Sequence, residues 1–172
     1  MDGYVNVDKY GSPDLRLDLE TFPWPWDSNS VAKIEMIHVL EHLGQHVDVY
    51  RQIIQEIYRI SQPQALVHIV VPHHRHDDML HDPTHVRTIT PMGLSMFSQA
   101  LNRQWQASGA ANTPLGMYWE VDFALKETHY VPSELWHQWK QGRSGTDLEL
   151  LQQGTLYNNL IQEVDMTLVA VK

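Results

Sequence analysis

Two histidines and a glutamate stand inside an apolar stretch of the chain. The segment IHVLEHL, residues 37–43, places His38, Glu41 and His42 among isoleucine, valine and leucine side chains. A histidine whose pKa is near the ordinary value of about 6.5 is suited to general-base catalysis at neutral pH. Because a buried polar group is costly without a partner, these side chains must bind or pair with something. Either a ligand or local hydrogen bonds can satisfy them.

Histidines are also concentrated further along the sequence. The chain holds 11 of them, and five fall in HHRHDDMLHDPTH, residues 73–85, interleaved with aspartates. The favoured interpretation of this segment is a solvated, mobile loop, and it covers His73, His74, His76 and His81. Contacts to a substrate or adventitious metal binding are the alternatives for these four residues.

The composition is that of an ordinary globular protein. A length of 172 residues is enough for a buried core, and we expect one domain over residues 1–172. No apolar run approaches the roughly 20 residues that span a bilayer, and the first residues lack the features of a signal peptide. The formal charge of −9 argues against nucleic-acid binding, because phosphate contacts require clustered lysine and arginine. The absence of cysteine fits a reducing compartment. Together, these features of the sequence predict a cytoplasmic protein that binds no membrane.

The centre of the chain reads as one strand–helix–strand unit. A buried strand is expected at 31–40, a helix at 46–61 that Pro63 ends, and a second buried strand at 65–72. Strand, helix and strand within about 40 residues imply parallel pairing. The sequence therefore predicts an α/β fold with a mixed sheet.

The other elements are expected on either side of this unit: strands at 4–8, 14–19, 117–131 and 163–172, a helix at 90–101, and loops at 22–30 and 102–116. Ligands of such sheets bind beyond the carboxyl ends of the parallel strands. Asp8, Asp18, the 38–42 group and the 73–85 segment each follow an expected strand. We therefore expect them to converge on one edge of the sheet.

Three successive segments carry a family resemblance: GYVNVD, then LRLDLETFPWPWDSNSVAKIEMIHVLEHL, then YRQIIQEIYRISQPQALVHIVVPH. Together they resemble a class I S-adenosylmethionine-dependent methyltransferase of the type 11 kind over residues 3–101, and more loosely over the last strand. The resemblance implies a Rossmann-like three-layer sandwich, with a mostly parallel sheet and an antiparallel C-terminal hairpin. It also implies S-adenosylmethionine as cofactor and methyl transfer as the reaction.

The resemblance assigns cofactor contacts to the first two strands. Asp8 would accept hydrogen bonds from the ribose hydroxyls, and Asp18 with the backbone of Leu19 would face the adenine edge. From the residues alone, a turn or capping role is the alternative for Asp8.

The chain departs from the family pattern at its start. The family's first, central strand and the glycine-rich loop that approaches the cofactor have no counterpart in this sequence. We expect either a truncated domain or a sheet with a gap, which a homodimer partner could cover. A non-catalytic methyltransferase-like binding module is accordingly the alternative function.

The opening motif also has a place in the resemblance. In ubiquinone-biosynthesis O-methyltransferases and the plant small-RNA 2′-O-methyltransferase, Glu-x-x-Glu-His and a later histidine hold a divalent metal at the substrate hydroxyls. Here the matching residues are His38, Glu41, His42 and His85. Three imidazoles and one carboxylate suit zinc, iron, manganese or nickel better than magnesium.

The resemblance therefore implies a specific reaction. Metal-assisted methyl transfer to a hydroxyl of a small-molecule or glycan acceptor is expected, with His42, Glu41 and His85 as catalytic candidates. The competing interpretation is that these side chains only cap the following helix or bond locally.

Other enzyme classes match less well. His-x-x-Glu-His is also the inverted zinc-peptidase motif, in which the ligands and a glutamate base share one helix, and Glu120 or Glu127 would then be the third ligand. That motif belongs on a long helix, whereas Gly44 follows here within two residues. A Ser/His/Asp hydrolase is no better supported, because no Gly-x-Ser-x-Gly elbow exists in the sequence. No Walker-type loop exists either, which excludes an NTPase.

Overall fold

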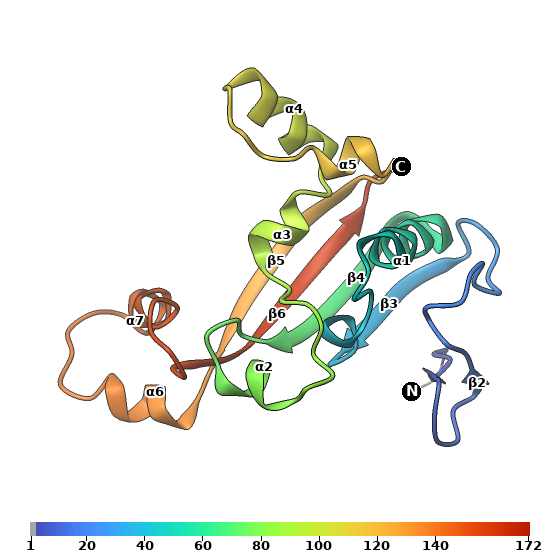
Figure 1. Ribbon diagram of the computed structural model, residues 1–172. Helices are drawn as coiled ribbons and strands as arrows, with labels where there is room; N and C mark the ends of the chain where they lie inside the picture. Colours follow the sequence, from blue (N-terminus) through green and yellow to red (C-terminus); the bar gives the residue numbers. More distant parts are fainter. Residues whose placement is uncertain (1–2) are drawn as a thin grey trace.

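A four-stranded mixed sheet forms the centre of the computed structural model, which describes residues 3–172 (Figure 1). The strands are β3 (Val31–Ile37), β4 (Ser61–Pro72), β5 (Phe123–Pro132) and β6 (Ile161–Ala170), in the order β3-β4-β6-β5. β3 and β4 are parallel, whereas β6 is antiparallel to both of its neighbours. The predicted α/β class is confirmed, with a larger antiparallel part than the sequence indicated.

The helix α1 (Val47–Ile60) makes the crossover between β3 and β4. Its apolar residues recur at helical spacing, and Ile53, Ile54 and Ile57 are buried against the sheet. The helix ends where Ser61 becomes extended and bonds the carbonyl of Ile57 through its amide and its hydroxyl. Pro63 therefore lies inside β4. The prediction that Pro63 ends the helix is wrong.

The expected helix at 90–101 is two helices with a break between them. α3 (Pro91–Ser95) stops before Ser98, whose hydroxyl accepts the N–H of Leu101 and so starts α4 (Gln99–Ala107). The 102–116 segment was predicted to be a loop, which is wrong for its ends. It contains most of α4 and the start of α5 (Leu115–Tyr118).

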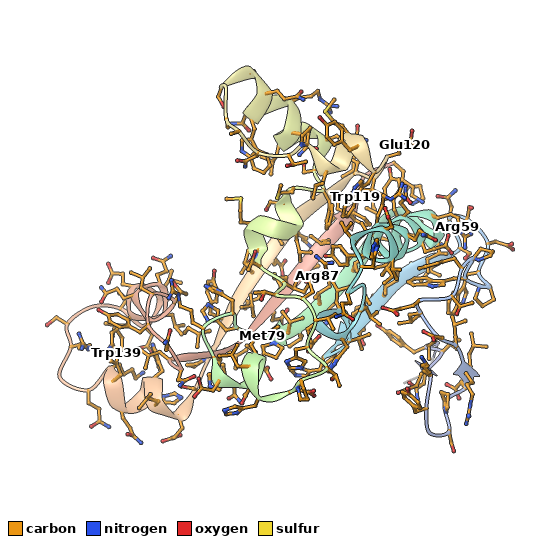
Figure 2. The ribbon with its side chains drawn as sticks, viewed as in Figure 1. Arg59, Met79, Arg87, Trp119, Glu120 and Trp139 are labelled. Atoms are coloured by element: carbon orange, nitrogen blue, oxygen red, sulfur yellow. The ribbon has the colours of Figure 1, made fainter. Side chains whose placement is uncertain are left out.

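Two further helices lie between the last two strands. α6 (Glu134–Trp139) and α7 (Asp147–Gly154) enclose a small apolar cluster of their own, made of Trp136, Leu150, Leu160 and Ile161. We call residues 134–159, which contain α6 and α7, the projection. Figure 2 shows Trp139 in the projection, away from Trp119 and Arg59. Ser133 donates its N–H to the carbonyl of Leu160 at 2.9 Å, so the hairpin of β5 and β6 is closed beneath the projection.

The first strands are much shorter than expected. β1 (Val7–Asp8) and β2 (Leu15–Arg16) form a separate parallel pair. Within residues 3–172, β3 pairs only with β4 and is therefore an edge strand of the main sheet. No helix of this range is long and apolar enough to cross a membrane.

The two faces of the sheet differ in burial. Alternate residues of β4 and β6, such as Val67, Ile69 and Met166, belong to the main core beneath α1. The residues between them, such as His68 and Asp165, are about a quarter to a third exposed and bond each other at 2.8 Å. This second face of the sheet is therefore less buried than the face beneath α1.

Candidate functional site

The loop after β3 turns a glutamate into the protein. His38 has a left-handed backbone (φ 53°), and its N–H still bonds the carbonyl of Val70 on β4. A short 3-10 helix η1 (Leu40–His42) follows, and in it the side chain of Glu41 is fully buried. The sharp turn at the end of the strand thus places a carboxylate at the carboxyl edge of the two parallel strands.

A second loop brings His85 to this carboxylate. The N–H groups of Val86 and Arg87 donate to the backbone carbonyl of Glu41 at 2.9 and 3.1 Å. The imidazole rings of His42 and His85 lie 4.6 Å apart, edge to face. Backbone hydrogen bonds therefore fix the two loops to each other at the site.

Glu41, His42 and His85 converge as a possible ligand set. One ligand atom from each side chain lies within 4.8 Å of the others. Both carboxylate oxygens of Glu41 are buried without a hydrogen-bond partner among the described residues. The nearest charged or titratable group is His38, whose Nδ1 lies 3.4 Å from Oε1. A buried carboxylate normally pairs with a cation, a hydrogen-bond donor or an ordered water.

The hydrogen bonds of the two histidines assign their tautomers. The Thr84 hydroxyl donates to Asp82 at 2.6 Å, so the Nδ1–H of His42 must donate to Thr84 Oγ1 at 2.8 Å. His85 Nδ1 faces the carbonyl of Met79 at 3.1 Å and is likewise the donor. In the neutral form of each ring, Nε2 is then the nitrogen without a proton, and such a nitrogen can bind a metal.

His38 does not complete the same set. Its Nδ1 is 3.4 Å from Glu41 Oε1, and its Nε2 is 3.1 Å from Glu163 Oε1. The imidazole therefore bridges two carboxylates beside the three converging residues. Sequence reasoning missed Glu163, which opens the pairing of β6 with β4 opposite Pro72. Only the strand order reveals that neighbour.

A cleft of about 650 Å³ lies above these residues. We call it the histidine cleft, and its lining is His38, His42, Pro72, Asp78, His81, Asp82, Pro83, His85 and Glu163. It is located at the carboxyl ends of β3 and β4, where ligands of α/β sheets bind. The predicted convergence of the 38–42 and 73–85 segments on one edge agrees with this geometry.

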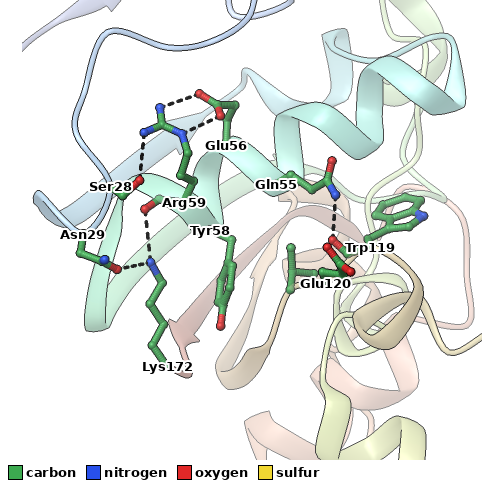
Figure 3. Close-up of a pocket in the computed structure, with 10 residues that line it drawn as sticks. Ser28, Asn29, Gln55, Glu56, Tyr58, Arg59, Trp119, Glu120 and Lys172 are labelled. Atoms are coloured by element: carbon green, nitrogen blue, oxygen red, sulfur yellow. Dashed lines mark hydrogen bonds and ion pairs between the residues drawn. The ribbon is translucent and has the colours of Figure 1, made fainter.

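A second cleft, of about 440 Å³, lies beside α1 and the C-terminal residue (Figure 3). Its polar groups largely satisfy each other: Arg59 forms two hydrogen bonds to Glu56, and Gln55 donates to the carbonyl of Trp119 at 2.9 Å. Glu120 lines this cleft and not the histidine cleft. It is therefore not the third peptidase ligand, and His38 and His42 do not share the helix that a peptidase needs.

The histidine-rich segment is more ordered than predicted. Its residues 77–81 form the helix α2, which the side chain of His76 caps. His73 is only 1% exposed and packs against His74. Burial and the neighbouring His74 and Arg75 lower the pKa of His73 to about 4, so it is neutral at pH 7. The solvated-loop interpretation is wrong for His73.

The three predicted cofactor residues are engaged locally. Asp8 accepts the N–H of Tyr10 at 2.7 Å, and Asp18 pairs with Lys9 at 2.6 Å, which lowers the pKa of that carboxyl. The carbonyl of Leu19 accepts the indole N–H of Trp24. None of the three lines either cleft. Their role in cofactor binding stays a prediction.

Comparison with known proteins bears on the fold. No family model and no curated protein matches the sequence. Among solved structures, a SAM-dependent methyltransferase from Archaeoglobus fulgidus is similar with a TM-score of 0.51 at 12% identity, over 84% of this chain and 61% of that protein. One from Methanosarcina mazei gives 0.46 at 12% identity, over 90% of this chain and 65% of that protein.

The chain thus spans less than two thirds of the length of these two structures. At this identity the likeness concerns the fold alone. The parallel β3–β4 pair with its helical crossover and the antiparallel β5–β6 hairpin are the parts already described. The chain has the fold of the class I S-adenosylmethionine-dependent methyltransferases.

Proposed function

We propose that this chain provides the acceptor site of an S-adenosylmethionine-dependent methyl transfer to a hydroxyl of a small molecule or glycan. In this proposal, Glu41, His42 and His85 hold a divalent metal that binds the acceptor hydroxyl. The carrying observation is the fully buried Glu41 carboxylate, which has no hydrogen-bond partner and lies beside two histidines. A divalent cation there would lower the pKa of a bound hydroxyl.

The surrounding groups suit this role. Thr84 and the Met79 carbonyl orient the two imidazoles so that each Nε2 is free for a ligand. His38, held by Glu163, lies at the mouth of the site and is our candidate for removing the acceptor proton. Two neutral imidazoles and one carboxylate favour zinc, manganese, iron or nickel over magnesium.

The second part of the proposal concerns the contacts to the cofactor. Asp8, Asp18 and Leu19 would contact the adenosine of S-adenosylmethionine, which supplies the methyl group. Their present local hydrogen bonds favour the second candidate function, a metal- and acceptor-binding module without methyl transfer. In either case a second copy of the chain at the open edge of β3 is the proposed way to complete the sheet.

Metal binding is tested by titrating Zn²⁺ calorimetrically into the chain and by recording the visible spectrum with Co²⁺. We expect one site per chain, and loss of that site in Glu41→Gln. His129→Asn, which changes an exposed histidine of β5, is the matched control and should bind Zn²⁺ normally. Equal binding by wild type and Glu41→Gln would refute the metal site.

Cofactor binding has its own test. S-adenosylhomocysteine is titrated into the Zn²⁺-loaded chain and into Asp8→Ala. Binding that the variant loses supports the transferase, because Asp8 is then in contact with the ribose. Metal binding without any binding of S-adenosylhomocysteine supports the module.

A further inference from the structure

The histidine cleft carries negative charge from three separate elements. Asp78 lies in α2, Asp82 in the loop that follows, and Glu163 in β6. The described residues that line the cleft include no lysine or arginine. The three carboxylates therefore face a shared space without a cationic side chain in the lining.

These carboxylates are reachable from the cleft. Their side chains are 46%, 45% and 29% exposed for Asp78, Asp82 and Glu163, so a ligand can contact them. Their present neighbours are mainly neutral or titratable groups: Gln162 and His76 at Asp78, Thr84 and His85 at Asp82, and His38 at Glu163.

A separate observation concerns the buried carboxylate next to the cleft. Glu41 is fully buried behind the histidines of the lining, and neither of its oxygens has a hydrogen-bond partner among the described residues. Its carboxylate lies beside His38, His42 and His85, all of which line the cleft. The acidic rim and the unpartnered buried carboxylate therefore belong to one site.

We infer that the acceptor carries a cationic amine beside the hydroxyl that binds at Glu41, His42 and His85. This inference rests on the proposed function and narrows its acceptor to amino alcohols, amino sugars or catecholamines. The rim of Asp78, Asp82 and Glu163 receives the ammonium group. An acceptor with a phosphate or carboxylate in the same place meets like charges, which disfavours its binding.

The test uses two catechols that differ in the sign of one charge. Dopamine and 3,4-dihydroxyphenylacetate carry the same hydroxyl pair, with an ammonium on one and a carboxylate on the other. Each is titrated calorimetrically into the Zn²⁺-loaded protein at low salt, in the absence of oxygen. We expect dopamine to bind at least about tenfold more tightly, since a charge held near the surface contributes about this factor.

One charge of the rim is then removed in Asp78→Asn, at a carboxylate that pairs with His76 and Gln162. The preference of the protein for dopamine should fall by about threefold, because one of the three facing charges is gone, while Zn²⁺ affinity is kept. His129→Asn again serves as control and should keep the full preference. Normal Zn²⁺ binding with equal affinity for the two catechols would overturn the inference and leave the metal site standing. Failure of the wild type to bind Zn²⁺ would instead overturn the proposed function.

Discussion

At the scale of single residues, the site is defined by which groups already have partners. His42 and His85 each use Nδ1 as a donor, to Thr84 and to the carbonyl of Met79. Glu41, in contrast, is fully buried and forms no hydrogen bond among the described residues. Burial of an ionised carboxylate in this condition costs several kcal/mol unless a cation compensates it. Among the three converging side chains, Glu41 is therefore the one whose polar atoms still lack a hydrogen bond.

His73 makes the stability of the protein depend on pH. Its pKa is about 4 in the folded chain, below the value of about 6.5 in an unfolded one, so the unfolded state binds more protons. The stabilisation is complete above pH 6.5 and is lost as the pH falls toward 4. We expect the free energy of unfolding to drop by about 1–2 kcal/mol from this residue between pH 7 and 5.

Urea unfolding at the two pH values measures this effect. His73→Asn keeps a side-chain acceptor for the N–H of Arg75 and should flatten the pH dependence. His129→Asn, at an exposed position, should leave it unchanged. If the free energy of unfolding of His73→Asn depended on pH as strongly as that of the wild type, the assignment of this effect to His73 would be wrong.

At the scale of elements, Gly44 sets how the site loop enters α1. Its φ is +68°, and a Cβ there would lie 2.6 Å from Cα and Cβ of Tyr50. Its N–H donates to Glu20, and its carbonyl accepts from Arg87, whose guanidinium lies 4.0 Å from the centroid of the Tyr50 ring. The glycine thus joins the loop of Glu41 to the first turn of the crossover helix.

Two alanine substitutions separate the effect of the contact with Tyr50 from the effect of the left-handed backbone conformation. Gly109 has a similar φ of +72° but nothing within 4 Å of its Cβ position. We expect Gly109→Ala to cost about 1 kcal/mol, from the left-handed backbone alone. Gly44→Ala should cost at least about 3 kcal/mol and weaken Zn²⁺ binding, because Tyr50 must move. Equal unfolding free energies for the two variants would show that the contact with Tyr50 is unimportant.

The sequence predicted the elements whose pattern is local. The strand–helix–strand unit with its amphipathic α1 was found within a few residues, as were the last strand and the grouping of Glu41, His42 and His85. The break at Ser98 was missed because one apolar pattern runs through both α3 and α4. Glu163 was missed because its place depends on strand order. The burial of His73 depends on tertiary packing that no local pattern records.

At the scale of the whole molecule, the apolar side chains form a main core and a smaller cluster at α6 and α7, and Tyr130 packs against both. The main core lies between α1 and the sheet, whereas the projection buries four residues around Trp136. The projection is inserted between the ends of β5 and β6, which remain paired at Pro132 and Ile161. The sheet therefore does not need the projection in order to close its hairpin.

Replacing residues 134–159 by Asn-Gly tests this independence, since that dipeptide favours a two-residue hairpin between Ser133 and Leu160. We expect a folded protein with a cooperative urea transition. Its Zn²⁺ affinity should stay within about threefold of wild type, because the proposed ligands lie in other segments. Some loss of stability is expected, as Asn159 no longer bonds Asp77 at the start of α2. An unfolded product would show that the projection is part of the core.

The one-sided pairing of β3 gives this strand two kinds of amide. His38 donates its N–H to the carbonyl of Val70, so by alternation the amides of Lys33, Glu35 and Ile37 point away from β4. Amides of β3 that point away from β4 exchange their hydrogen with water freely. The amides that bond β4 exchange only when the hydrogen bonds between the two strands break. A short deuterium pulse should therefore label every second residue of this seven-residue strand. Any chain that pairs along the edge would erase that alternation, so the isotope pattern reports whether the edge is occupied.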